Sequence, residues 1–188
     1  MGTNDSTGRR ALVVYESMYG NTHLIASAIG EGLRSQGVDA EVVPVGRGAG
    51  PDVTGVELLV VGGPTHVHGM TSARTRAAAR DAVDDHEWLT LDDDGDDTGL
   101  RDWLGAVDGL DVDAVAFDTR RHMSPLLTGR ASKGIAKLLR RHGARVVDEP
   151  SSFYVTDHDE LEPGEEDRAR AWGTLLAEAV LERTGSVG

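Results

Sequence analysis

The feature that most constrains the fold is an apolar run joined to a helical pattern by a short polar loop. Residues 11–15 (Ala-Leu-Val-Val-Tyr) are apolar without interruption, which is typical of a central parallel strand covered on both faces. From Leu24 to Leu33 the apolar residues recur at helical spacing. Between them, Gly20 permits a tight turn. Such a loop directs backbone N–H groups to the positive end of the helix dipole, and therefore suits a phosphate.

This loop contains no Lys or Arg, and Glu16 lies beside it, so dipoles and hydroxyls rather than a cation must hold the phosphate. Its polar residues are Ser17, Tyr19, Asn21 and Thr22. A Walker loop ends in Gly-Lys-Ser/Thr and a dinucleotide loop reads G-x-G-x-x-G, and neither pattern is present. A plain helix cap by Asn21 or Thr22 remains an alternative, but it explains one polar residue rather than four.

Strand and helix patterns alternate along the rest of the chain. Further strands are predicted at residues 40–45, 56–61, 114–117 and 144–147, the last resuming at 153–155, and helices at 71–83, 100–107, 132–142 and 165–183. This alternation predicts an α/β fold with a doubly wound, five-stranded parallel sheet and helices on both faces. The loops after the first, third and fourth strands then converge at the carboxyl edge of the sheet, where such folds bind ligands.

The first loop resembles the FMN phosphate loop of the flavodoxin family. The similarity covers an apolar-apolar-aromatic strand end followed by Ser17, Gly20, Thr22, Ala26 and Ile29 at the spacing of the family. The resemblance implies the flavodoxin-like strand order 2-1-3-4-5 and FMN as the cofactor. It implies phosphate contacts from Ser17, Met18, Tyr19, Gly20, Asn21 and Thr22.

Two further loops are expected to contact the flavin ring. The second loop, residues 62–70, offers backbone groups and side chains of Pro64, Thr65, His66, Val67, His68 and Gly69. The third loop, residues 118–123, resembles the second flavin loop of the family, which implies contacts from Asp118, Thr119, Arg120, Arg121 and His122. Alternatives are that His66 and His68 bind a metal or are merely exposed, and that the arginines pair with acidic neighbours.

The expected ring environment departs from that of classical flavodoxins, which flank the ring with aromatic residues. Here the corresponding positions hold His66, His68 and Met70 in the second loop, and Arg121, His122 and Met123 in the third. Nearby cations favour the anionic hydroquinone, so the sequence predicts a flavin potential higher than in classical electron carriers.

The composition limits the setting of the protein. The 188 residues predict one domain, residues 11–184, preceded by a disordered tail at 1–10 and interrupted by an acidic insertion around 84–99. With 32 acidic and 19 basic residues, a formal charge of −13 disfavours nucleic acid and anionic membranes. It suits a basic partner or a saline cytoplasm, and simple solubility is the alternative explanation. The run at 92–97 looks like a calcium loop, but position six lacks the required glycine.

No cysteine is present, which excludes thiol catalysis and cysteine-bound metals, and no apolar run is long enough to span a membrane. The first ten residues lack the apolar core of a secretion signal, so a cytoplasmic location is expected. The resemblance implies an electron carrier between an NAD(P)H-linked reductase and an unidentified acceptor. Two alternatives remain open: an FMN-dependent NAD(P)H reductase of quinones or similar acceptors, and a flavin-free binding or scaffold domain.

Overall fold

A computed structural model describes residues 9–46, 50–66, 69–72, 77, 99–107, 109–122 and 129–185. The strands in this part of the chain are β1 (Arg10–Tyr15), β2 (Asp39–Pro44), β3 (Leu58–His66), β4 (Gly69–Met70), β5 (Asp113–Arg121), β6 (Arg145–Val146) and β7 (Ser151–Val155). The helices are α1 (Asn21–Ser35), α3 (Leu100–Ala106), α5 (Ala131–Arg141) and α6 (Glu165–Gly185). None of these helices is long and apolar enough to cross a membrane.

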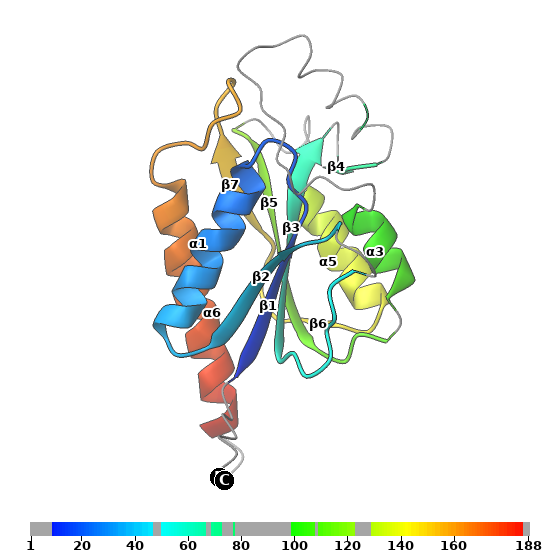
Figure 1. Cartoon of the computed structure of the whole chain (residues 1–188), viewed down its shortest axis with the longest axis vertical. Coiled ribbons are helices and arrows are strands. Elements are labelled where there is room, and N and C mark those ends of the chain that lie inside the picture. The colour runs from blue at the N-terminus through cyan, green and yellow to red at the C-terminus, as the bar shows by residue number, and fades with distance from the viewer. Residues whose placement is uncertain are drawn as a thin grey trace, which may run out of the picture.

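The strands form a parallel sheet in the order β2-β1-β3-β5-β6 (Figure 1). β7 continues beyond β6 along the same edge of β5, so together they form the predicted fifth strand with its interruption near Pro150. β5 is the predicted fourth strand. The predicted order 2-1-3-4-5 is therefore confirmed, with β2 at one edge of the sheet.

Helices cover both faces of the sheet, as predicted: α1 and α6 lie on one face, α3 and α5 on the other (Figure 1). β1 divides its side chains between the two cores. Ala11, Val13 and Tyr15 pack beneath α1 and α6, whereas Leu12 and Val14 pack beneath α3 and α5. All five are at most 2% exposed, which is why this strand reads as an unbroken apolar run.

α1 and α6 approach each other closely because glycines occupy their contact. A Cβ atom added to Gly32 would lie 2.1 Å from the carbonyl oxygen of Arg170. One added to Gly173 would lie 2.3 Å from the carbonyl oxygen of Ile29. Any larger side chain would force the helices apart.

β3 and β5 run further than predicted, so the expected second and third loops begin as strand. Gly62 pairs with Phe117 and Pro64 with Thr119, and β3 then turns back into a short hairpin with β4. The aromatic ring of Phe117 fills the space where a side chain at Gly62 would lie, with 2.0 Å between its Cζ and an ideal Cβ. The predicted helix at 71–83 and the acidic insertion lie largely outside the described residues.

Candidate functional site

The loop between β1 and α1 has the predicted tight turn. Gly20 adopts a left-handed conformation, with φ of 88°, at the N-cap of α1. The Ser17 hydroxyl oxygen accepts a hydrogen bond of 3.1 Å from the Gly20 N–H, and the Leu24 N–H donates to the Gly20 carbonyl as the helix begins. Positive φ is easily adopted only by glycine, so this residue sets the shape of the loop.

The first turn of α1 offers backbone donors. The N–H groups of Asn21 and Thr22 meet no acceptor in the described part of the chain, as expected for the first residues of a helix without a side-chain cap. The alternative of a plain cap by Asn21 or Thr22 is therefore wrong. These amides, with the Ser17 hydroxyl, form a donor set without a cation that fits a small dianion.

The side chains of the loop attach it to neighbouring elements. The hydroxyls of Thr22 and Thr119 hydrogen-bond at 2.8 Å, which joins α1 to β5. The Asn21 side-chain amide donates to the Asp159 carbonyl oxygen at 2.6 Å, in the connection from β7 to α6. These groups position the loop, whereas sequence reasoning expected their polar atoms to face the phosphate.

Tyr19 and Met18 complete the loop. Met18 is buried, whereas Tyr19 is half-buried. Burial, followed by the negative charge of Asp159, raises the pKa of the Tyr19 phenol above its ordinary value. The phenol therefore stays protonated, and remains a hydrogen-bond donor, beyond the pH at which a free tyrosine ionises.

Thr65 and Asp118 cap α5 from outside the helix. An oxygen of the buried Asp118 carboxylate accepts bonds from the Ser132 N–H at 2.8 Å and from the Thr65 hydroxyl at 3.1 Å. The Thr65 hydroxyl oxygen accepts from the Ala131 N–H at 2.9 Å. These two predicted flavin contacts thus fix the start of α5 at the carboxyl edge of the sheet.

Two buried oxygens at this edge have no hydrogen-bond partner among the described residues. They are Oδ1 of Asp118 and Oγ of Ser132, and both side chains are fully enclosed. Buried polar atoms are normally bonded, so a water molecule or a bound ligand here would satisfy them.

The predicted basic residues of the third loop turn toward β7 and the connection that follows it. Arg120 is buried; it donates to the Gly129 carbonyl and lies over the Tyr154 ring. Arg121 lies 3.7 Å from Asp157, which agrees with the alternative of acidic pairing for this residue. The His122 ring stacks on Tyr154, with centroids 4.3 Å apart.

Tyr154 is an aromatic residue at this edge that sequence reasoning did not assign to the site. The sequence could have indicated it, because Tyr154 lies in the predicted fifth strand. In the predicted order this strand pairs with the fourth, which carries the third loop. Tyr154 faces Arg120 directly across the β5–β7 pairing.

Glu16, which lies beside the loop in the sequence, has a structural role that sequence reasoning did not assign. Its side chain is 7% exposed and points toward the first residue of α3. One carboxylate oxygen accepts from the Thr71 hydroxyl, and the other accepts from the Leu100 N–H at 3.0 Å. Glu16 therefore holds the first residue of α3 instead of opposing the phosphate.

The remaining predicted contacts lie in and beside the β3–β4 hairpin. Pro64 and Gly69 are half-buried, whereas Val67, His68 and the side chain of His66 lie outside the described residues. Within the described ranges, no three His, Asp or Glu side chains gather as metal ligands.

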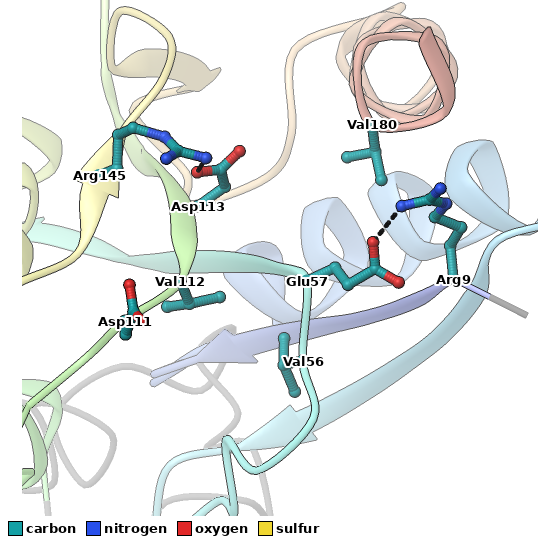
Figure 2. A pocket seen from close by; sticks show the side chains of 8 residues that line it. All are labelled: Arg9, Val56, Glu57, Asp111, Val112, Asp113, Arg145 and Val180. Atoms are coloured by element: carbon teal, nitrogen blue, oxygen red, sulfur yellow. Dashed lines mark hydrogen bonds and ion pairs between the residues drawn. The ribbon is translucent and has the colours of Figure 1, made fainter. Parts of the chain in front are cut away.

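A separate cavity of about 320 Å³ lies at the amino ends of β3, β5 and β6, beside Glu57, Asp113 and Arg145 (Figure 2). The ion pairs Arg9–Glu57 and Arg145–Asp113 line it. Parallel α/β folds bind ligands at the carboxyl ends of strands, so this cavity is distinct from the candidate site.

Known structures share this fold. The chain is similar to a flavodoxin from the domain Archaea, at 21% identity and a TM-score of 0.59, covering 92% of this chain and 99% of that one. It is also similar to flavodoxin 2 from Bacillus cereus, at 18% identity and a TM-score of 0.60, covering 93% and 99%. A third similar structure is a diflavin flavoprotein from Nostoc sp., at 19% identity and a TM-score of 0.54, covering 94% and 96%.

Sequence comparison gives the family. No curated protein matches the chain. The family profile described as flavodoxin matches residues 13–111, which include β1, the loop of residues 17–22 and α1, and span more than half of the sequence. Together with the confirmed strand order, this match shows that the chain belongs to the flavodoxin family.

Proposed function

We propose that the chain binds FMN and carries electrons between an NAD(P)H-linked reductase and an acceptor in the cytoplasm. The observation that carries this proposal is the donor set at residues 17–22. It combines two first-turn amides, the Ser17 hydroxyl and the left-handed Gly20, with no lysine or arginine in the loop. This arrangement suits the terminal phosphate of a mononucleotide.

The ring would lie between the β3–β4 hairpin and the end of β5, where Asp118 and Tyr154 line the edge of the sheet. FMN, when bound, supplies the one- and two-electron redox chemistry. The contribution of the protein is to bind the phosphate, to orient the ring and to tune its potential. Asp118 stabilises this edge, since its carboxylate holds the start of α5.

Titration with FMN and with riboflavin tests the proposal, because riboflavin lacks the phosphate. We expect FMN to bind more tightly than riboflavin, measured by quenching of flavin fluorescence. Equal affinity for the two flavins, or no binding of FMN, would overturn the proposal.

Ser17→Ala tests the phosphate contact directly. Loss of a hydrogen bond to a charged group costs about 1.5 kcal/mol, so FMN affinity is expected to fall about tenfold while riboflavin affinity stays unchanged. Ser27→Ala, further along α1, is the matched control and is expected to bind FMN as the wild type does. An equal loss in both variants would contradict the assigned contact.

The higher flavin potential stays a prediction. It rests on the buried Arg120 at the end of β5, because positive charge favours the anionic hydroquinone, whereas Arg121 is paired with Asp157. Redox titration of the FMN-bound protein measures it, and a hydroquinone couple as low as that of classical flavodoxins would refute it.

A further inference from the structure

Positive charge is concentrated in one stretch of this acidic chain. Residues 119–147 contain eight of the 19 Lys and Arg residues and none of the 32 Asp and Glu residues. The rest of the chain therefore holds 11 basic residues against 32 acidic ones. This stretch includes the end of β5, all of α5 and β6.

The exposed face of α5 carries four of these cations: Lys133, Lys137, Arg140 and Arg141. The opposite face of the helix packs into the core through Ile135, Ala136 and Leu139. Within the described part of the chain, none of the four cations forms an ion pair, whereas the nearby Arg145 pairs with Asp113. We call these four residues the α5 basic face.

Only two of these four cations stabilise the helix itself. Arg140 and Arg141 lie in the last turn, where cations interact favourably with the helix dipole. Lys133 lies in the first turn, where the dipole favours an acid, and it repels Lys137 one turn later. These two residues are also the only lysines in the chain, so their charges point to a role outside the helix.

The charge distribution favours a compact acidic protein as the partner. At physiological salt, charges act over about 8 Å, so a partner that touches only α5 experiences the basic face and not the acidic remainder. An extended polyanion or an anionic membrane would also meet the acidic surface. A symmetric contact between two copies through α5 would bring like charges together.

The position of α5 connects this face to the candidate flavin site. Its first residues, Ala131 and Ser132, bond to Thr65 and Asp118 at the carboxyl edge of the sheet. We propose that the α5 basic face docks an acidic protein with which the flavin exchanges electrons, an inference that rests on the proposed function.

Electron transfer to two probe proteins of opposite charge tests this surface. Plastocyanin is an acidic copper protein and cytochrome c is a basic haem protein, and each accepts one electron per metal from the reduced flavin. We expect Lys133→Gln/Lys137→Gln to slow the reduction of plastocyanin about tenfold at physiological salt of about 0.15 M, measured by stopped-flow absorbance. The rate with cytochrome c should not fall.

A second double variant controls for net charge. Leu175→Glu/Leu181→Glu makes the same change in net charge on exposed positions of α6, across the sheet from α5. We expect this control to reduce plastocyanin at close to the wild-type rate. An equal loss of rate in both double variants would overturn the docking surface.

Carbodiimide cross-linking tests the surface without flavin. The reagent joins a lysine amine to a carboxylate of plastocyanin and itself takes up the water. We expect adducts at Lys133 and Lys137. If they form but FMN does not bind, the docking surface stands and the electron-carrier proposal falls. Adducts absent from both lysines, or formed only between copies of this chain, would overturn the docking proposal.

Discussion

At the scale of single residues, the direction of a side chain decides what it does. Thr65 and Asp118 were predicted to face a flavin, yet both bond to the start of α5. The reason is that Arg130, the N-cap residue of α5, provides no side-chain cap, so the cap comes from neighbouring strands. The sequence shows which residues reach this edge, but not which helix requires their oxygens.

Tyr19 provides a prediction for this scale. Its raised pKa means that the folded protein holds the phenol proton more tightly than the unfolded chain does. Its contribution to stability is therefore complete below the ordinary pKa of about 10 and is lost as pH rises through the folded value. The free energy of unfolding measured with urea should be lower at pH 11 than at pH 8. The Tyr19→Phe variant should show a smaller difference, because it lacks the contribution of this phenol.

The charge of Asp159 is a cause of the shift that can be tested separately. Asp159→Asn should lower the Tyr19 pKa. The titration of Tyr19 is followed by ultraviolet absorbance, after subtracting the titration curve of the Tyr19→Phe variant, which lacks this phenol. Asparagine also tolerates the positive φ of 53° at this position. Asp157→Asn removes an equal charge from a more exposed neighbour, and an equal effect there would contradict the assigned cause.

At the scale of elements, the sequence predicted strands and helices well wherever the apolar period was clear. α5 and α6 begin within one residue of their predicted starts. The end of β3 was missed because Gly62, Gly63 and Pro64 have loop-forming chemistry, and the end of β5 was missed because residues 118–121 are polar. The pairing of Gly62 with Phe117 is a tertiary contact, and it outweighs that local preference.

The contact between α1 and α6 predicts that two glycine-to-alanine substitutions differ in their effect on stability. Gly173→Ala places a methyl group against the Ile29 carbonyl, and such overpacking costs about 1–3 kcal/mol. The melting temperature should fall by about 2–12 °C. Gly105→Ala in α3 meets open space, so its helix-forming gain should leave stability unchanged or raised. Calorimetry of both variants checks this, and stabilisation by Gly173→Ala would contradict the close approach.

At the scale of the whole molecule, the charge of −13 acts against a phosphate held without a cation. Added salt screens this repulsion, so FMN should bind more tightly at 0.5 M than at 0.02 M NaCl. Riboflavin, which has no phosphate, is the control, and its affinity should not show this additional increase with salt. A lower FMN affinity at high salt would instead indicate a cation at the phosphate. Titration of both flavins at the two salt concentrations decides between these outcomes.

The charge total came from the sequence alone, but its distribution required the fold. The stretch of residues 119–147 becomes a surface only because α5 buries its apolar stripe and leaves Lys133, Lys137, Arg140 and Arg141 outside. A count of residues cannot distinguish that face from cations neutralised by ion pairs, as at Arg145.

The Glu16 carboxylate bears on how much the segment between Thr71 and Leu100 can vary in length. It accepts hydrogen bonds from both Thr71, just after β4, and Leu100, the first residue of α3, so these two points of the chain lie close together. Closing a loop between fixed ends becomes harder only by about 0.6 kcal/mol for each doubling of its length. A change in the number of residues between Thr71 and Leu100 is therefore expected to cost little free energy, while the strands of the described part of the chain keep their register.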